Sequence, residues 1–385
     1  MVDFEIKTKQ LIDSLKGICA SYGLGNDGNE FKIITQVFLY KFLNDKFAFE
    51  LKKINKDVAN AGVKWEEAYI SLSDNDKDML RFELGAKTAF LNSEHLISTL
   101  FNRQNESDFA KLFDDTLRDI AKQNNDIFAV KTDGGTKITL FEQNGLSNFI
   151  SDESKRDSFC RAIINKLADF SFEQIFKEKF DFFATIFEYL IKDYNKDSGG
   201  KYAEYYTPHA VAKIMAAIMV KGDVKNVSCY DPSAGSGTLL MNIAHAIGED
   251  KCTIYSQDIS QKSSNLLRLN LILNNLVHSI SNIIQGNTML HPFHKENNEL
   301  RKFDYIVSNP PFKMDFTDFR DDLDTKENKE RFFAGIPKIP AKKLDSMSIY
   351  SLFLQHIIYS LKVGGKAAIV VPTGFITAQS GIDKS

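Results

Sequence analysis

The chain has 385 residues, of which 43% are hydrophobic and 26% charged, and its formal net charge is −3. This composition is that of an ordinary globular protein with room for two or three domains. It excludes a globally basic surface for nucleic acid, so that any phosphate contacts would come from local patches or from another subunit.

The four cysteines lie far apart without a C-x-x-C pair, and they predict neither a disulfide framework nor a zinc site. We therefore expect no metal centre. The first residues carry no signal-peptide pattern, and no apolar run is long enough to span a membrane. These features predict a cytoplasmic protein without a membrane partner.

Residues 1–170 have the pattern of helices. Apolar side chains recur there at three- and four-residue spacing, with Lys, Asp and Glu between them, at Phe31, Ile34, Val37, Phe38, Phe42 and Phe49. Residues 107–122 and 157–169 repeat this pattern, and a turn signal at 132–136 separates helical stretches. We predict an all-α domain that faces a partner or DNA, with the aromatic stripes as its core.

A long apolar-rich helix is predicted at about 173–194, with a stop signal at 197–200. The next helix is predicted from Ala210 to Met219. Thr207 is its candidate N-cap, because proline follows at position 208. The free N–H groups of such a helix start could hold a carboxylate, although a plain helix start is the alternative interpretation.

From Val224 onward, short apolar runs alternate with helical segments. Strands are predicted at 226–230, 252–257, 280–285, 303–308 and 366–371. Helices are predicted at 238–247, 261–275 and 347–361. This alternation predicts a doubly wound α/β domain, with a parallel sheet and helices on both faces.

The first of these strands runs into a glycine-rich loop, Asp231-Pro232-Ser233-Ala234-Gly235-Ser236-Gly237-Thr238. A dinucleotide fingerprint would need glycine at Leu240, and no phosphate-binding Walker loop occurs anywhere in the chain. Asp231 would repel a phosphate but suits an ammonium group. Asp258, at the end of the second strand, is placed like the carboxylates that bind ribose hydroxyls. This combination fits S-adenosylmethionine best.

The strand at 303–308 stops at Asn309-Pro310-Pro311-Phe312, because two prolines remove backbone donors. The loop presents an Asn amide, a Pro carbonyl and an aromatic face at the carboxyl end of a strand, the edge where ligands bind in open α/β sheets. An ordinary strand-terminating turn is the alternative.

Three motifs together resemble those of amino-group DNA adenine methyltransferases. They are Tyr205-Tyr206-Thr207-Pro208, Asp231-Pro232-x-x-Gly235-x-Gly237 and Asn309-Pro310-Pro311-Phe312, in that order. More narrowly, the chain resembles the modification (M) subunit of type I restriction-modification systems. Further matches are the helical first half, 187–191, Gln355-His356 and 361–365.

The resemblance implies a Rossmann-like doubly wound class I methyltransferase domain over 171–385, preceded by the all-α domain over 1–170. It also implies further strands and a helical tail beyond Pro372, so the second domain is expected to be truncated at its C-terminal end. One departure is Asn287, where the family usually has Asp. Its amide can still bond the cofactor's adenine if the donor side faces an acceptor.

The implied activity is methyl transfer from S-adenosylmethionine to the N6 amino group of a flipped adenine in duplex DNA. Catalytic roles are implied for Asn309, Pro310, Pro311 and Phe312: Asn309 and the Pro310 carbonyl accept the amine hydrogens, and Phe312 stacks on the base. Cofactor contacts are implied for Tyr205, Tyr206, Thr207, Pro208, Asp231, Pro232, Ala234, Gly235, Ser236, Gly237, Thr238, Asp258, Ile259 and Asn287. The implied partners are duplex DNA, a specificity (S) subunit with two M per S, and a restriction (R) subunit.

The polar segment 313–345 is predicted to be a solvated loop, and as a hypothesis it acts as a lid beside the flipped base. Two other functions stay open. One is methylation of another planar amino group, such as a protein glutamine or an RNA guanine. Enzymes for those reactions also use an Asn-Pro-Pro-aromatic loop, usually with Tyr at the last position. The other is a non-catalytic DNA-binding or assembly subunit that keeps the fold.

Overall fold

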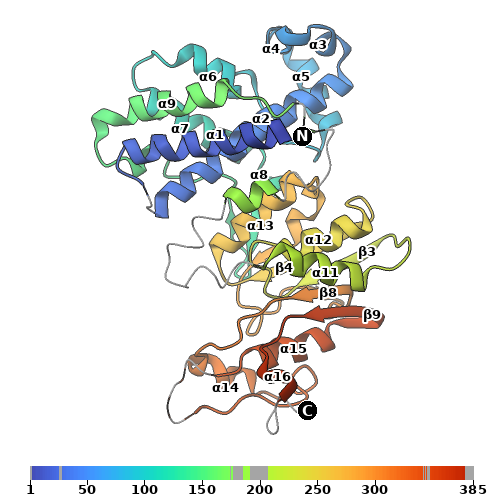
Figure 1. Cartoon of the computed structure of the whole chain (residues 1–385). Helices are drawn as coiled ribbons and strands as arrows, with labels where there is room; N and C mark the ends of the chain where they lie inside the picture. Colours follow the sequence, from blue (N-terminus) through green and yellow to red (C-terminus); the bar gives the residue numbers. More distant parts are fainter. Residues whose placement is uncertain are drawn as a thin grey trace. The chain divides into compact units, whose positions relative to one another are not determined.

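The structure is a computed structural model that describes residues 2–25, 28–173, 175–176, 185–190, 207–340, 342, 344 and 347–377. The chain forms two compact units (Figure 1). A helical unit comprises Met1–Ala129 and Thr139–Tyr202, and a sheet unit comprises Val130–Ile138 and Ala203–Ser385. Of the helix predicted at 173–194, residues 185–190 are helical, but residues 173, 175 and 176 form turns, so its predicted start is wrong. The stop signal at 197–200 lies outside the described residues. The domain boundary after residue 170 stays a prediction.

Every regular element described in the helical unit is a helix. The all-α prediction for 1–170 is wrong at residues 130–138, which form two strands and belong to the sheet unit. The α-helices are α1 (Val2–Ser21), α2 (Gly28–Ile54), α3 (Lys56–Asn60), α4 (Trp65–Ile70), α5 (Asp74–Leu84), α6 (Ile97–Arg103), α7 (Phe109–Gln123), α8 (Asn125–Phe128) and α9 (Arg156–Ala168). The stretches predicted at 107–122 and 157–169 correspond to α7 and α9.

Helix α2 differs from the amphipathic helix that its sequence predicts. Its apolar stripe is buried, but so are charged side chains between the apolar ones. They pair within the helix: Lys41 with Asp45 at 2.9 Å, and Lys46 with Glu50 at 3.0 Å. Because α1, α3, α5 and α9 all contact α2, it has no broad solvent face, and these i,i+4 pairs neutralise the buried charges.

The sheet unit contains a seven-stranded sheet in the order β2-β1-β5-β4-β3-β8-β9, in which all neighbours are parallel except β1 and β2. The strands are β1 (Val130–Thr132), β2 (Lys137–Ile138), β3 (Val227–Asp231), β4 (Cys252–Asp258), β5 (Ile283–Gln285), β8 (Phe303–Ser308) and β9 (Leu361–Ile369). A small hairpin joins β6 (Lys295–Glu296) to β7 (Glu299–Leu300). The predicted α/β class is confirmed.

The helices of this unit are α11 (His209–Met219), α12 (Thr238–Ile247), α13 (Gln261–Leu273), α14 (Arg320–Leu323), α15 (Tyr350–Tyr359) and α16 (Gly374–Thr377). From β3 the chain adds β4 and β5 on one side, and then β8 and β9 on the other. The strand order therefore reverses between β3 and β8, where open α/β sheets bind ligands. Gly237 caps α12 with a φ of +83°, and a Cβ there would overlap Leu267 of α13, so a close approach of the two helices requires glycine.

Two strands, β5 and β9, begin three or more residues away from their predicted starts. Residues 280–282 belong to a 3-10 helix, Val277–Asn282, in which the buried Ser279 hydroxyl accepts a hydrogen bond from the backbone of Ile254. Only 283–285 of the predicted strand is extended. Strand β9 begins at Leu361 and not at 366, because Gly364 takes a φ of +78° and lets the chain pair irregularly with β8.

The turn predicted at 132–136 exists, but it joins two strands and not two helical stretches. Strand β1 pairs parallel with β5, so residues from the first half of the sequence extend the sheet. Asp133 donates its backbone N–H to the carbonyl of Gln285 at 2.9 Å. Gly286 follows Gln285, and a Cβ at this position would lie 2.5 Å from Asp133 Cγ. Glycine therefore permits the β1–β2 hairpin to lie against the end of β5.

Candidate active site

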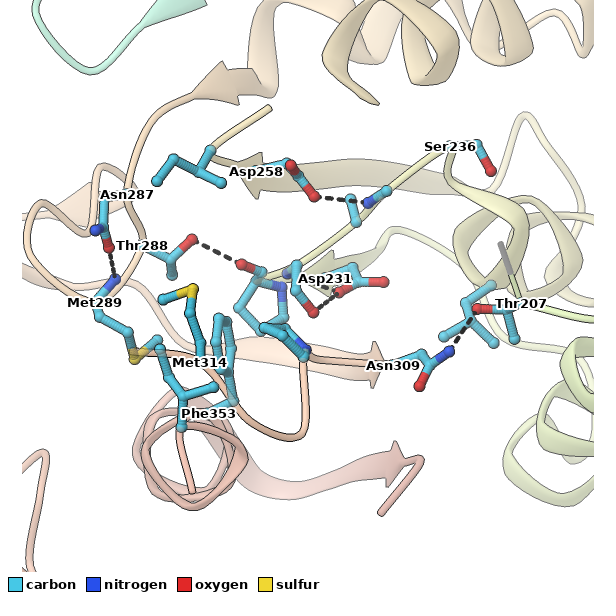
Figure 2. A pocket seen from close by; sticks show the side chains of 18 of the residues that line it. Thr207, Asp231, Ser236, Asp258, Asn287, Thr288, Met289, Asn309, Met314 and Phe353 are labelled. Carbon is cyan, nitrogen blue, oxygen red and sulfur yellow. Dashed lines mark hydrogen bonds between the residues drawn. The ribbon is translucent and has the colours of Figure 1, made fainter. Parts of the chain in front are cut away.

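A pocket opens at the carboxyl ends of β3, β4, β5 and β8, where the strand order reverses (Figure 2). The predicted site residues that line it are Thr207, Asp231, Pro232, Ala234, Gly235, Ser236, Thr238, Asp258, Ile259, Asn287, Asn309 and Pro311. Pro208, Gly237, Pro310 and Phe312 are sequence neighbours of lining residues and do not line the pocket themselves. Tyr205 and Tyr206 lie outside the described residues.

Asp231 ends β3 and is 1% exposed. Its Oδ1 accepts a hydrogen bond from the backbone N–H of Ser233 at 2.9 Å, and the Ser233 hydroxyl shares a hydrogen bond with the Ser308 hydroxyl at 2.7 Å. Burial raises the pKa of Asp231 to about 7, and the nearby Asp258 carboxylate also raises it. Because a buried carboxylate is costly to ionise alone, a cation bound beside it would be strongly favoured.

Asp258 ends β4 and holds the glycine-rich loop in place. Its Oδ2 accepts a hydrogen bond from the backbone of Gly235 at 2.8 Å, and its Oδ1 accepts one from the backbone of Ser260 at 2.8 Å. Burial raises the pKa of this carboxyl group. Each carboxylate oxygen can accept two hydrogen bonds, so both retain capacity for a ligand hydroxyl. The predicted contact to ribose stays a prediction.

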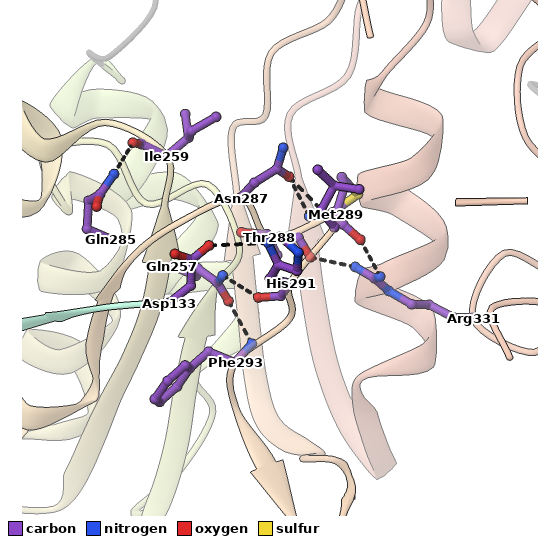
Figure 3. A network of polar contacts seen from close by, with 11 residues as sticks. Asp133, Gln257, Ile259, Gln285, Asn287, Thr288, Met289, His291, Phe293 and Arg331 are labelled. Atoms are coloured by element: carbon purple, nitrogen blue, oxygen red, sulfur yellow. Dashed lines mark hydrogen bonds and ion pairs between the residues drawn. The ribbon is translucent and has the colours of Figure 1, made fainter. Parts of the chain in front are cut away.

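Asn287 lies just after β5, and its amide is oriented by the following turn. Its Oδ1 accepts a hydrogen bond from the backbone of Met289 at 3.0 Å (Figures 2 and 3) and another from the backbone of Leu290 at 3.2 Å. The acceptor end of the amide is therefore occupied, which leaves the Nδ2 donor for a ligand acceptor. Thr288 donates its hydroxyl to the Pro232 carbonyl at 2.7 Å, which ties this turn to the glycine-rich loop.

Asn309 follows β8 and contacts the segment before α11. Its Nδ2 donates to the Thr207 hydroxyl at 3.2 Å (Figure 2). The N-cap prediction for Thr207 is wrong, because α11 begins at His209 and Pro208 occupies the cap position. The bond to Thr207 occupies the donor end of the Asn309 amide. Phe312 is 36% exposed, and its ring meets Tyr350 edge-on with centroids 6.5 Å apart.

The pocket also has an apolar wall that was not predicted from the sequence. It is formed by Met289, Met314, Ile349 and Phe353. Met289, Ile349 and Phe353 belong to one buried cluster, against which Met314 packs. Such residues carry no local pattern that separates a pocket wall from an ordinary core position. A wall of this kind suits the flat apolar faces of a heterocyclic ring.

The segment 313–345 packs more extensively than the predicted solvated loop. Its acidic side chains, such as Asp321 and Asp322, are exposed as expected. Phe316, Leu323 and Phe332, in contrast, are buried in the cluster that contacts α15. The three- and four-residue spacing of Phe316, Phe319 and Leu323 among the acidic residues was the sequence pattern that could have predicted this packing. Residues 341, 343 and 345 lie outside the described part of the segment.

Within the described ranges, no three His, Cys, Asp or Glu side chains gather as the ligands of a metal ion would. No helix in the described part of the chain combines the length and apolar composition that a membrane crossing demands.

The chain is similar in sequence to methylase subunits of type I restriction enzymes and in fold to solved structures. The methylase subunit of the type I restriction enzyme MpnII from Mycoplasma pneumoniae is 26% identical, over 97% of this chain and 68% of the relative. The methylase subunit of the type I restriction enzyme MjaIX from Methanocaldococcus jannaschii is 26% identical, over 56% of this chain and 37% of the relative. The resemblance to type I modification subunits is thereby confirmed.

The crystal structure of a type I restriction-modification methyltransferase subunit from Streptococcus thermophilus has the same fold. It aligns with a TM-score of 0.74 and 21% sequence identity, over 98% of this chain and 77% of that one. The sequence profile of the family described as N-6 DNA methylase matches residues 178–384, more than half of the chain. This match confirms S-adenosylmethionine as the predicted cofactor. The chain belongs to the N-6 DNA methylase family.

Proposed function

We propose that this chain methylates the exocyclic N6 amino group of an adenine flipped out of duplex DNA, as the modification subunit of a type I restriction-modification complex. The observation that carries the proposal is that one pocket, at the reversal of strand order, brings together the residues predicted for the cofactor and for catalysis. Asn309 of the predicted catalytic loop borders this pocket together with Asp231, Asp258 and Asn287. Methyl donor and acceptor groups would thus meet in one place.

The residues of the pocket fit S-adenosylmethionine. The buried Asp231 carboxylate would hold the ammonium group, Asp258 the ribose hydroxyls, and the Asn287 donor a ring nitrogen of adenine. Met289 and Phe353 would flank the adenine ring. Bound there, the cofactor supplies an electrophilic methyl group on a sulfonium.

The chain's own contribution to the reaction lies in the Asn309–Phe312 loop. Adenine's amino nitrogen is a poor nucleophile, because its lone pair is delocalised into the ring. The Asn309 Oδ1 and the Pro310 carbonyl would accept its two hydrogens, which favours a tetrahedral nitrogen and frees the lone pair. Thr207 occupies the other end of the Asn309 amide, and the partly exposed Phe312 ring can stack on the flipped base.

The proposed partners are duplex DNA, a specificity subunit with two modification subunits per copy, and a restriction subunit. The similarity to the methylase subunits of type I restriction enzymes supports this assignment. The net charge of −3 also supports it, since a chain that reads DNA unaided would be expected to carry a basic surface.

The proposal is tested by transfer of a tritiated methyl group from S-adenosylmethionine to duplex DNA, RNA and protein, with and without the cognate specificity subunit. We expect label in N6-methyladenine of duplex DNA when the specificity subunit is present. Label in a protein glutamine or an RNA guanine would replace the proposed substrate. A complex that binds DNA without any transfer would favour a non-catalytic assembly subunit.

Affinity for S-adenosylmethionine should rise with pH between about 5.5 and 7. The pKa of Asp231 is raised to about 7, so the carboxyl group is neutral below that pH and attracts the ammonium only once ionised. The α-amino group itself keeps its charge up to about pH 7.7–8.0. A single ionisation gives a slope of at most about tenfold per pH unit. Calorimetric titration at several pH values measures this slope.

Asp231→Asn should bind the cofactor weakly and without this pH dependence. It should also change the stability of the cofactor-free protein. A carboxyl group whose pKa is higher in the folded than in the unfolded chain destabilises the fold as pH rises between the two values, here from about 4 to about 7. The variant should lose that decline. An unchanged pH slope in Asp231→Asn would remove Asp231 from the ammonium site.

A further inference from the structure

The insert between β8 and α15 is fastened to the sheet unit by a buried guanidinium. Arg331 is 3% exposed, and it donates to the Met289 carbonyl at 2.7 Å and to the Thr288 carbonyl at 2.8 Å (Figure 3). Its Nε donates to Nδ1 of His356 on α15 at 2.9 Å. The two carbonyls belong to the turn that begins at Asn287. Arg331 does not line the pocket itself, so it binds this part of the pocket wall from the side that faces away from the cavity.

Helix α15 holds the same part of the insert at a second point. The Gln355 side chain accepts a hydrogen bond from the backbone of Ala334 at 2.7 Å and donates one to the Gly335 carbonyl at 3.0 Å. The sequence analysis named Gln355-His356 as one of the matching motifs, and the proposed chemistry does not use it. Both members hold residues 331–335, and we call Arg331, Gln355 and His356 the clasp.

His356 is fixed as a neutral ring within the clasp. Burial and the charge of Arg331 hold the pKa of His356 well below its ordinary value. Because Nδ1 accepts from Arg331, the neutral ring carries its proton on Nε2, which lies 3.2 Å from the Tyr230 hydroxyl on β3. The clasp therefore links the insert, the turn after β5 and the strand that ends in Asp231.

The guanidinium depends on these neutral partners. Among the described residues, no acidic side chain forms an ion pair with Arg331. Each of its three nitrogens donates instead to one neutral acceptor, and burial lowers its pKa only to about 10, so it stays charged at neutral pH. A cation buried in this way holds its acceptors firmly, because separation from any of them leaves a charged donor unsatisfied.

We propose that the clasp positions the Asn287–Met289 turn for cofactor binding, so that Arg331, Gln355 and His356 are positioning residues of the S-adenosylmethionine site. Arg331 holds the carbonyls of this turn from outside the pocket. From inside, Asn287 Oδ1 holds the Met289 N–H, and the Thr288 hydroxyl holds the Pro232 carbonyl. Without the outer hold the turn can shift and carry the Asn287 donor away from the adenine. The inference rests on the proposed function through the adenine contact of Asn287.

The test is calorimetry with S-adenosylmethionine on the full chain and three variants. Arg331→Met leaves two buried carbonyls and an imidazole without their donor, and it should raise the dissociation constant about tenfold. Asn287→Ala should weaken binding to a similar extent. The double variant should lose clearly less affinity than the two single losses added together, because the amide that a misplaced turn carries away is already gone and only the Met289 contact is left to lose. A residue with a merely structural role would give additive losses.

Arg320→Met is the matched control, because Arg320 lies in the same insert and contacts no residue of the pocket through its polar groups: it pairs with the exposed Asp321 and Asp324 and donates to the Pro337 carbonyl at 3.2 Å. Its affinity for the cofactor should equal that of the wild type. If Arg331→Met does not unfold cooperatively, Gln355→Leu replaces it. That variant removes two bonds at 334–335 without stranding a charge, and it should still weaken binding severalfold.

Three outcomes would overturn the inference. They are unchanged affinity in the folded clasp variants, additivity with Asn287→Ala, and an equal loss in Arg320→Met. In each of these, the wild type still binds the cofactor and methylates DNA, so the proposed function stands. A wild-type chain that fails to bind S-adenosylmethionine would remove the proposed function and the inference together.

Discussion

Asn309→Ala should lower the rate of methyl transfer at saturating cofactor and DNA by about 10²–10³-fold, the effect of removing one preorganised polar group from a transition state. The Asn309 Oδ1 is the proposed acceptor for the target amine, and its Nδ2 contacts Thr207. Neither atom is assigned to the cofactor. The dissociation constant for S-adenosylmethionine should therefore stay within about twofold of the wild type. An interaction that is made only in the transition state changes the rate and leaves ground-state binding unchanged.

Asn309→Asp tests the chemical basis of this prediction, because a carboxylate keeps the acceptor and loses the donor to Thr207. It should retain part of the activity. Asn282→Ala is the control for an amide of the same unit, since Asn282 donates to the Ile254 carbonyl and does not line the pocket. Substantial transfer by Asn309→Ala would mean that the Asn309–Phe312 loop is structural.

The second large effect concerns the specificity subunit. The isolated chain should bind S-adenosylmethionine but show little preference among duplex sequences. A specific DNA interface buries about 1,000–2,500 Å² of protein and reads base edges through an element that fills a groove. The sequence offers no helix with an interleaved Arg, Asn and Gln face, and its net charge is −3. With the specificity subunit, preference for one split site should reach at least about 10³-fold over random duplex.

A random-sequence duplex library measures this effect when methylated positions are sequenced after reaction. The purified chain and its complex with the specificity subunit are compared at the same salt concentration, because phosphate contacts change with ionic strength. One adenine on each strand of a single motif is the expected product of the complex. Methylation of a defined motif by the chain alone would place recognition within it and contradict the type I assignment.

The centre of the sheet was predictable from the sequence, because turn residues delimit its elements. Helix 238–247 and strand 303–308 have the predicted bounds, since a glycine-rich loop precedes one and two prolines end the other. The hairpin β1–β2 was not predictable. Its strands are only three and two residues long, and they are extended because β5 pairs with β1. Short strands of this kind depend on tertiary pairing rather than on local propensity.

The residues of the site likewise include some that could be predicted from the sequence and some that could not. Asp231, Asp258 and Asn309 could be found because each lies at or just beyond the end of a predicted strand, where a polar residue stands out. The apolar wall could not be found, since Met289 and Phe353 resemble any core residue in sequence. Arg331 was also missed, because a single arginine in a charge-rich segment gives no sign that it is buried.

The pairing of β1 with β5 has a consequence for how the chain is made. Lys131 pairs with Ile284, more than 150 positions later, so a ribosome releases the hairpin long before its partner strand exists. Such long-range pairing forms slowly, and until it does both partners present unpaired backbone edges to other chains. A fragment that began at residue 171 would lack the hairpin and leave the edge of β5 open. Open edges recruit strands from neighbouring molecules, so such a fragment should aggregate where the longer chain does not.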